Sequence, residues 1–357
     1  MQSTRKPRPQ RSRALGLTLI AVLTLAACGE QGATDLTDSA PDPDPDGAVE
    51  PTEADAQETD APDGFPLTVE NCGEDITFAA PPERVILLNS APVTSLAAIG
   101  AMDRVVARAG AFPEEYFDDQ TREAISAVPS LGDELDDSGH LQISQEVVID
   151  QEPDLVMGLP DGFSREGLDA VGIPVIVEPV YCPDGGIENP DFDDVYAQVS
   201  FYGEVFGLEN AAAAAVSDLQ ERVETMREAG GDGEERTAAT LFPTIGGTPF
   251  AYGTRSMAHP QLEAAGFTNA FADTDDRVFE VTIEELLDRD PDVLILLHVD
   301  GEPGPVEDAV TSLPGAEGLT AVQNDDVLVQ LFNFTEPPTP LSLDGLEAIV
   351  ERFGSDE

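Results

Sequence analysis

Apolar runs and apolar periodicities alternate along most of the chain. Runs such as "RVILLN" at 84–89, "DLVMGL" at 154–159 and "DVLILLH" at 292–298 are typical of parallel strands buried on both faces. Between such runs, apolar residues recur every three or four positions, as at 93–99 and 144–151, which predicts amphipathic helices. Regular strand–helix alternation predicts an α/β fold with parallel sheets flanked by helices.

The same patterns predict the remaining elements. Further strands are expected at 66–71, 104–110, 173–179, 237–242, 249–253 and 326–332. Further helices are expected at 164–171, 259–265, 282–289, 306–312 and 340–353. Strand–helix alternation therefore occurs twice, once on each side of residue 200.

A different pattern separates these two halves. Between 191 and 229 apolar residues recur at alternating spacings of three and four, apart from one gap between Phe206 and Ala212. This predicts one helix of about 35 residues, reaching about 50 Å, or two helices joined near Gly207. A helix here is well placed to link two lobes, with a coiled-coil dimer arm as the alternative. We predict a first lobe at 65–190, an inter-lobe helix at 191–229 and a second lobe at 230–357.

One helix-then-strand unit occurs in both halves. "QEVVIDQEPDLVMG" begins at Gln145, and "EELLDRDPDVLILL" begins at Glu284. Aligning Pro153 with Pro291 places Glu146 over Glu284, 138 positions apart (146 to 284). A glutamate in the first turn of a helix interacts favourably with the helix dipole, so one copy alone requires no functional explanation. A glutamate at the same place in both units does call for such an explanation.

The N-terminal residues have the pattern of an export signal. A basic segment runs to Arg13, and the apolar stretch from Ala14 to Ala27 is too short to span a bilayer. It ends in "LAACG", which resembles a bacterial lipoprotein signal. We therefore predict removal of 1–27 and lipidation of Cys28. The alternative is an ordinary secretory signal with an incidental cysteine.

The segment from 28 to 64 is rich in Asp, Pro, Thr, Ala and Glu. It cannot bury enough apolar surface to fold, so we predict a disordered acidic linker between the lipid and the folded body. The expected location is the outer face of the cell membrane, with the lipid as the only membrane contact.

The formal charge of −54 excludes several partners. Beyond Arg13 the chain has twelve arginines and no lysine against 71 acids. Such a surface repels nucleic acid and anionic lipid, so neither is expected to bind. A salt-tolerant or alkaline-tolerant solvation shell is the simpler interpretation of the acidity. No loop has the spacing of a calcium site, and no Cys/His cluster has that of a zinc site.

No pattern indicates catalysis. The chain has no G-x-S-x-G elbow, P-loop or G-x-G-x-x-G fingerprint, and only three histidines. Acidic residues are so numerous that no carboxylate pair stands out as a glycosidase dyad. We therefore predict a protein that is not an enzyme and needs no cofactor.

With Cys28 lipidated, two cysteines remain. In an exported chain, Cys72 and Cys182 predict a disulfide, which would stabilise the fold by about 4–5 kcal/mol in the chain-entropy model. Two free thiols or a metal-binding pair are the alternatives.

Several segments, taken in order, resemble a known family. "PPERVILLNSAPVTSLAAIGAMDRVVARAG", "ISQEVVIDQEPDLVMG", "VTIEELLDRDPDVLIL", "LEAAGFTNAF" and "LTAVQNDDVLVQL" resemble iron–siderophore/cobalamin-type substrate-binding proteins of ABC importers. The resemblance covers nearly all of 65–353. It implies two α/β lobes joined by one long helix, with the ligand in the cleft between them. It also implies delivery to a two-subunit permease powered by an ATPase.

The resemblance assigns a role to the repeated glutamates. In the family, one glutamate of each lobe meets arginines of one permease subunit, and Glu146 and Glu284 match these positions. An exposed carboxylate is well suited to pair with arginine.

Cleft residues are expected at the carboxyl ends of parallel strands. Arg108 and Arg255 are favoured because ferric siderophores are often anionic, although either arginine also suits a structural ion pair. Tyr252 and Phe334 suit stacking on a chelate, with core packing as the alternative. The candidates are Asn89, Ser90, Arg108, Leu159–Asp161, Tyr252, Arg255, His298 and Asn333–Phe334.

The leading hypothesis is a lipid-anchored binding protein that captures a ferric siderophore. Cobalamin and haem are alternatives within the same architecture. A cell-surface hydrolase or lyase, or a sensory or adhesive lipoprotein, is the alternative from a different class.

Overall fold

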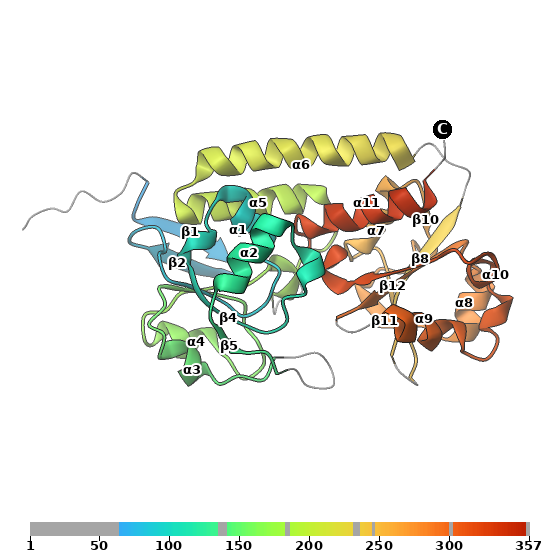
Figure 1. The fold of residues 1–357 in the computed structure, drawn as a ribbon, viewed down its shortest axis with the longest axis horizontal. Coiled ribbons are helices and arrows are strands. Elements are labelled where there is room, and N and C mark those ends of the chain that lie inside the picture. The colour runs from blue at the N-terminus through green and yellow to red at the C-terminus, as the bar shows by residue number, and fades with distance from the viewer. Residues whose placement is uncertain are drawn as a thin grey trace, which may run out of the picture. The chain divides into compact units, whose positions relative to one another are not determined.

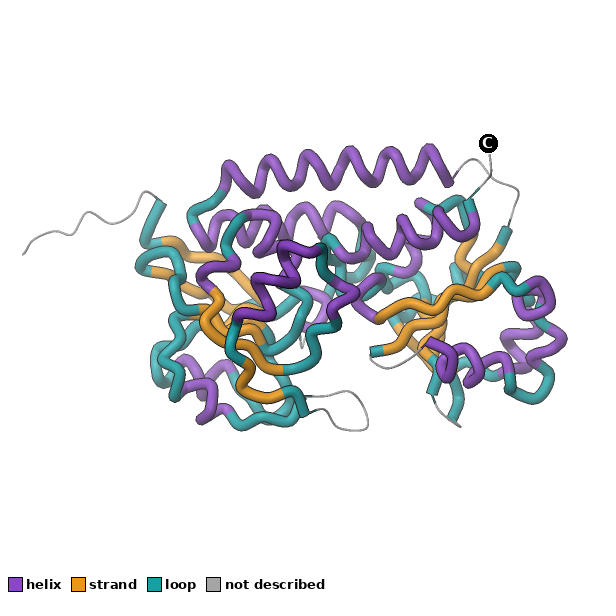
Figure 2. Tube along the Cα trace, viewed as in Figure 1, coloured by secondary structure: helices purple, strands orange, loops and turns teal. Residues whose placement is uncertain are grey.

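The computed structural model describes residues 64–134, 141–182, 186–230, 236–244, 247–299 and 303–354. They form two α/β lobes, each with its strands in the interior (Figures 1 and 2). The predicted signal peptide, Cys28 and nearly all of the predicted acidic linker lie outside the described residues. Among the helices that are described, none is long and apolar enough to cross a membrane.

The first lobe contains a parallel sheet of five strands in the order β5-β4-β3-β6-β7. These are β3 (Val85–Leu87), β4 (Val105–Ala109), β5 (Ser130–Gly132), β6 (Leu155–Met157) and β7 (Val175–Ile176). The covering helices are α1 (Val93–Ile99), α2 (Asp119–Ala127), α3 (Gln145–Ile149) and α4 (Arg165–Asp169).

Successive residues of β3 enter two different cores, because side chains alternate along a strand. Val85 and Leu87 belong to the core that contains α1 and the long helices. Ile86 and Leu88 belong to the core that contains α3 and α4. Burial on both faces explains why the sequence of this strand is continuously apolar.

An antiparallel hairpin precedes this sheet, formed by β1 (Leu67–Asn71) and β2 (Glu74–Phe78). Its two turn residues, Cys72 and Gly73, have φ angles of 57° and 78°. Two successive positive values are typical of a tight type I′ hairpin turn. The turn presents Cys72 to Cys182, and the predicted disulfide between them is confirmed.

The segment predicted as an inter-lobe helix forms two helices, α5 (Phe192–Phe206) and α6 (Glu209–Gly230). The chain breaks at Gly207, whose φ of 64° is left-handed and therefore ends α5. The single 35-residue helix is thus wrong, and the alternative of two helices joined near Gly207 is correct.

The two helices pack against each other, and α6 alone makes the long connection (Figure 1). At one end α6 packs on α1, and at the other it packs on α7 (Ala258–Ala264) and α11 (Leu341–Phe353). A single 22-residue helix therefore contacts both lobes.

The second lobe has a six-stranded sheet in the order β11-β9-β8-β12-β13, with β10 also paired to β8. Its strands are β8 (Thr237–Phe242), β9 (Phe250–Tyr252), β10 (Thr268–Asn269), β11 (Val278–Glu280), β12 (Val293–His298) and β13 (Val327–Leu331). Its other helices are α8 (Ile283–Arg289), α9 (Pro303–Thr311) and α10 (Thr320–Asn324).

This second sheet is mixed, which corrects the prediction of a parallel sheet in each lobe. β9 runs antiparallel to β8, and β11 antiparallel to β9. Only a short loop joins β8 to β9, whereas a parallel pair needs a crossover of about a dozen residues or more. The α/β fold class with two lobes is confirmed.

Candidate ligand-binding site

A cavity of about 770 Å³ lies between the two lobes. The first lobe contributes the segments that follow β3, β4, β6 and β7. The second contributes the ends of β8 and β9 and the residues that follow β12 and β13. The carboxyl ends of the strands therefore meet at the cavity, as expected for α/β lobes.

Of the residues predicted from strand ends, Asn89, Ser90 and Tyr252 line this cavity. The predicted loop at 159–161 and Asn333 line it as well. The other four candidates lie outside the lining: Arg108, Arg255, His298 and Phe334.

Three of these four side chains make contacts with other residues of the protein. The Arg108 guanidinium lies over the Phe112 ring, 4.9 Å from its centroid. Arg255 lies 3.9 Å from a carboxylate oxygen of Glu188. Phe334 packs edge-on against Tyr116, at 5.2 Å between ring centroids.

Asn89 is positioned by a close approach of two loops. Its Oδ1 accepts a hydrogen bond from the backbone N–H of Ala91 at 3.0 Å. Its Nδ2 would lie 2.6 Å from a Cβ on Gly158, which has a φ of 103°. The loop after β6 therefore requires glycine at this point, because any side chain would displace the amide.

Two hydrogen bonds join the lobes at the cavity. Asn333 Nδ2 donates to Ser90 Oγ at 3.0 Å, and the Asn333 backbone N–H donates to the Tyr116 hydroxyl at 2.9 Å. Both run from the segment after β13 to the first lobe, so they connect the two lobes at this edge of the cavity.

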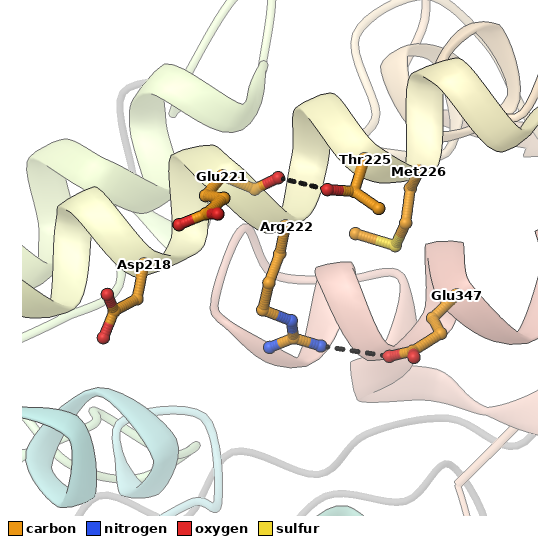
Figure 3. Close-up of a pocket in the computed structure, with 6 residues that line it drawn as sticks. All are labelled: Asp218, Glu221, Arg222, Thr225, Met226 and Glu347. Atoms are coloured by element: carbon orange, nitrogen blue, oxygen red, sulfur yellow. Dashed lines mark hydrogen bonds and ion pairs between the residues drawn. The ribbon is translucent and has the colours of Figure 1, made fainter.

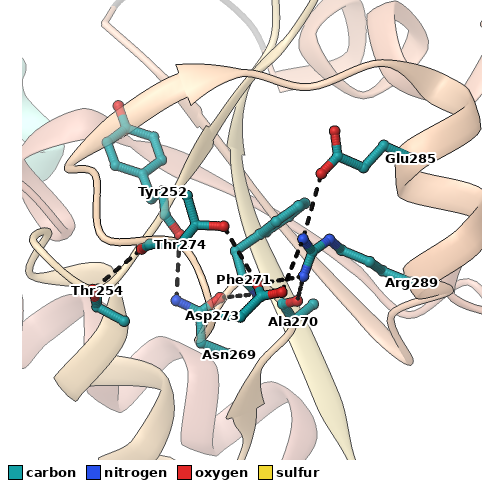
Figure 4. A network of polar contacts seen from close by, with 9 residues as sticks. All are labelled: Tyr252, Thr254, Asn269, Ala270, Phe271, Asp273, Thr274, Glu285 and Arg289. Atoms are coloured by element: carbon teal, nitrogen blue, oxygen red, sulfur yellow. Dashed lines mark hydrogen bonds and ion pairs between the residues drawn. The ribbon is translucent and has the colours of Figure 1, made fainter.

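A hydrogen bond to its backbone carbonyl fixes the position of Tyr252. Its carbonyl accepts a hydrogen bond from Asn269 Nδ2 at 3.3 Å, within the polar network drawn in Figure 4. The side chain is 3% exposed, and burial raises the pKa of its hydroxyl, which remains neutral. It offers the cavity a rigid aromatic surface.

Among the described residues, Arg277 is the one arginine that lines the cavity. Its Nη1 lies 3.2 Å from Glu336 Oε2, and the Glu336 side chain is fully buried. The second oxygen, Oε1, accepts the backbone N–H of Met257 at 2.9 Å. Burial raises the pKa of Glu336, and Arg277 opposes that rise. The pair cancels in charge, so the cavity holds no unbalanced arginine.

Arg277 could not be predicted from the expectation that cleft residues follow the carboxyl ends of parallel strands. This residue precedes β11, and in that antiparallel strand Val278 pairs with Tyr252 at the end of β9. The amino end of β11 therefore reaches the same edge of the sheet as the carboxyl end of its neighbour.

Glu178, immediately after β7, is a second buried acid at the cavity. It is 3% exposed, and the Tyr202 hydroxyl of α5 donates to its Oε1 at 2.6 Å. Burial raises its pKa to about 7, against the lowering effect of that hydrogen bond.

A second hollow, of about 400 Å³, lies between α6 and α11 (Figure 3). Arg222 of α6 donates to Asp344 at 2.6 Å and to Glu347 at 3.2 Å, both on α11. These contacts attach α6 to the second lobe, so we interpret this hollow as structural. Its lining residues are Asp218, Glu221, Arg222, Thr225, Met226 and Glu347.

The repeated unit found in the sequence is also repeated in structure. The helix caps Ser144 and Thr282 lie 138 positions apart, as do the first residues of α3 and α8 and those of β6 and β12. Glu152 and Asp290, also 138 apart, both have positive φ.

The repeated aspartates have a shared structural role. Asp154 accepts the backbone N–H groups of Glu83 and Arg84 at 2.8 Å, just before β3. Asp292 accepts the backbone N–H of Thr237, the first residue of β8, at 2.8 Å. Each carboxylate therefore holds the start of the neighbouring parallel strand.

Glu146 and Glu284 have no comparable role. Both are exposed in the first turns of α3 and α8. Glu146 hydrogen-bonds its own backbone amide and the Ser144 side chain, which lowers its pKa and keeps it charged. The adjacent Glu285 instead lies 3.4 Å from Arg289 (Figure 4). Glu284 makes no hydrogen bond or ion pair with another described residue.

Comparison with known proteins identifies the class. Residues 85–330 match the family described as periplasmic binding protein, and the chain belongs to this family. Its members are binding components of transport systems, which agrees with the prediction that the chain is not an enzyme.

Among solved structures, one from Saccharomonospora viridis is described as an ABC-type Fe3+-hydroxamate transport system. It is 62% identical, with a TM-score of 0.77, over 82% of this chain and all of that one. The vitamin B12-binding protein of Vibrio cholerae, at 19% identity and a TM-score of 0.56, covers 76% of this chain and 96% of its own. The haem-binding protein of the same organism, at 16% and 0.59, covers 75% and 97%. These two show the fold alone. No curated protein matches.

Proposed function

We propose that this protein captures a ferric hydroxamate chelate outside the cell and delivers it to an ABC permease. The cavity between the lobes carries the proposal, because Arg277, the one arginine among the described residues of its lining, is neutralised by Glu336. Fe³⁺ bound by three monoanionic hydroxamates has no net charge at the metal, whereas a tris-catecholate carries three negative charges. A cavity whose described lining has no unpaired arginine to balance three negative charges suits the hydroxamate complex better. The similarity to the S. viridis protein supports the same chemistry.

Direct binding tests this ligand class. Tyrosine fluorescence quenching should show submicromolar binding of ferrichrome, an uncharged ferric trihydroxamate, because Tyr116, Tyr181 and Tyr252 line the cavity. A ferric tris-catecholate, haem and cobalamin serve as comparison ligands under the same conditions. Tighter binding of any of these three than of ferrichrome would refute the hydroxamate assignment.

We also propose that Glu146 and Glu284 dock the two lobes onto the two permease subunits. The aspartates of the repeated unit hold neighbouring strands, whereas the exposed glutamates make no such contact: Glu146 bonds only at the start of its own helix. Stability alone therefore does not explain why Glu146 and Glu284 occupy the same position in the two repeated units. Carboxylates presented at helix starts suit pairing with permease arginines.

The double variant Glu146→Ala/Glu284→Ala tests the docking role. Uptake of ⁵⁵Fe-ferrichrome by whole cells should collapse, while affinity in solution stays the same, because neither residue lines the cavity. Asp150 and Asp288 provide a matched control: they are exposed, 138 positions apart and four residues after the glutamates. Their double change to asparagine should leave uptake intact. Normal uptake by the glutamate variant would eliminate the docking proposal.

Lipid attachment at Cys28 completes the proposed function. The tether would hold the binding domain near the permease through the acidic segment at 28–64. Changing Cys28 to alanine should release the protein from the membrane fraction into the medium while ferrichrome affinity persists. Retention of this variant in the membrane fraction would contradict a lipid anchor.

A further inference from the structure

We infer that Glu178 is a ligand-binding acid whose neutral carboxyl donates a hydrogen bond from Oε2 to an acceptor oxygen of the chelate, so that binding takes up a proton. The inference deepens the proposed function and rests on it for the ligand class. It goes beyond the similarity to known binding proteins, since it concerns one side chain of this cavity.

Glu178 lines the cavity although it is only 3% exposed. Tyr202 occupies Oε1, while the buried Oε2 has no hydrogen-bond partner among the described residues. A buried polar atom without a partner is costly, and such atoms are uncommon in folded proteins. A ligand in the cavity would supply the missing partner.

The segment that carries Glu178 is fixed at both ends. Asn71 exchanges two hydrogen bonds of 2.9 Å with the backbone of Val177, the preceding residue. At the other end, Cys182 is bonded to Cys72, the residue after Asn71. The carboxyl is therefore held in place before ligand arrives, as a binding group should be.

The charged and titratable groups around Glu178 give it no free cation. Tyr202 of α5 is fully buried and neutral, and Gln198 lies beside it. On the other sides the cavity presents Tyr181, Asp161 and Arg277, and Arg277 is paired with Glu336. Burial thus raises the pKa of Glu178 to about 7, and both protonation states are accessible near neutrality.

The chemistry of the ligand selects the neutral state. The metal-bound oxygens of a ferric hydroxamate are acceptors with partial negative charge, which repel a carboxylate and accept from a carboxylic acid. A bound chelate also excludes water from the cavity, which further disfavours the charged form. Affinity should then fall about tenfold for each pH unit above about 7 and level off below it.

The test is the dissociation constant of ferrichrome between pH 5.5 and 9, because this probe has no group that titrates in that range. The wild type should weaken as pH rises. Glu178→Gln should bind at all pH values as the wild type does at pH 5.5, since its amide donates from Nε2 and accepts from Tyr202. Calorimetry at pH 8 in two buffers of different ionisation enthalpy should show uptake of nearly one proton by the wild type and none by Glu178→Gln.

Tyr202→Phe gives an independent check of the assignment. Removing the hydroxyl that stabilises the carboxylate should raise the pKa of Glu178, so the midpoint of the pH profile should move upward. Thermal unfolding of each variant confirms that it is folded.

Three results would overturn the inference: a flat wild-type profile, affinity that increases with pH, or a pH dependence that persists in Glu178→Gln. The second would mean that the carboxylate accepts from an N–H of the ligand. Absence of ferrichrome binding at every pH is a distinct result, which overturns the proposed ligand class and this inference with it.

Discussion

Replacing Arg277 by methionine should destabilise the ligand-free protein by an amount that grows with pH. The change removes the partner of a carboxylate that is fully buried, while methionine preserves much of the apolar stem. Breaking a buried ion pair by removing one partner typically costs about 3–5 kcal/mol. Here protonation of Glu336 limits the cost, because a neutral acid needs no counter-ion.

The limit follows from the ordinary pKa of the group, 4.5. Protonating such a carboxyl at pH 7 costs about 3.4 kcal/mol, from 2.5 units at about 1.36 kcal/mol each. Burial already raises the pKa of Glu336 in the wild type, so part of this cost is present before the substitution. We therefore expect a loss at pH 7 that is smaller than this limit of about 3.4 kcal/mol.

The pH dependence has a definite sign. Because the pKa of Glu336 is raised in the folded state, ionising this carboxyl destabilises the folded protein. Stability is fully present below pH 4.5 and is lost as the pH rises through the pKa of the folded state. Without Arg277 the folded pKa rises further and the loss extends to higher pH. The difference between variant and wild type should thus be small at pH 4.5 and increase toward pH 8.

Urea denaturation of the wild type, Arg277→Met, Glu336→Gln and the double variant at pH 4.5, 6 and 8 measures this effect. The double variant should be more stable than Arg277→Met at pH 8, because no charge remains to be buried. Equal destabilisation of Arg277→Met at all three pH values, or no recovery in the double variant, would refute the electrostatic argument.

Three further predictions concern the ligand-free protein. Because the pKa of Glu178 is raised to about 7, Glu178→Gln should exceed the wild type in stability by about 3 kcal/mol at pH 8.5 and match it near pH 4.5, measured by urea denaturation; equal stability at pH 8.5 would contradict this. Cys72 and Cys182 are 110 residues apart, and changing both to serine should lower the free energy of unfolding by about 4–5 kcal/mol. In the wild-type domain, thiol titration after denaturation without reduction should find neither cysteine free. Gly345→Ala should cost about 1–3 kcal/mol because its Cβ would overlap the backbone oxygen of Phe334, whereas Gly304→Ala, with open space around it, should cost nothing.

Local sequence signals predicted most of the fold. The helix at 93–99 was predicted with its observed ends, and Gly100, with a φ of 78°, stops it. The mixed sheet was not predicted, because strand direction depends on how the chain returns to the sheet. The hairpin strand β2 and the helix α2 were also missed, since their apolar residues are few.

The site was only partly predictable. Asn89, Ser90 and Tyr252 follow from a general rule about strand ends. Arg277 and Glu178 depend on pairings that no local pattern encodes, with Glu336 and with Tyr202. Nothing in "IPVIVEP" distinguishes a buried glutamate from an exposed one. Arg108 and Arg255 were favoured for their charge, with a structural ion pair as the alternative; Arg255 lies near Glu188, and Arg108 lies over the Phe112 ring.

The hairpin at the start of the folded body has a consequence for the order of folding. Asn71 and Cys72 hold a segment that follows them by 106 and 110 positions. Contacts of such long range form late, because the intervening chain must be ordered first. A chain that has emerged only as far as α4 has every strand of this sheet except β7, and it lacks the wall that carries Glu178. This wall of the cavity therefore cannot be completed, and the disulfide cannot close, until the chain through Cys182 is available.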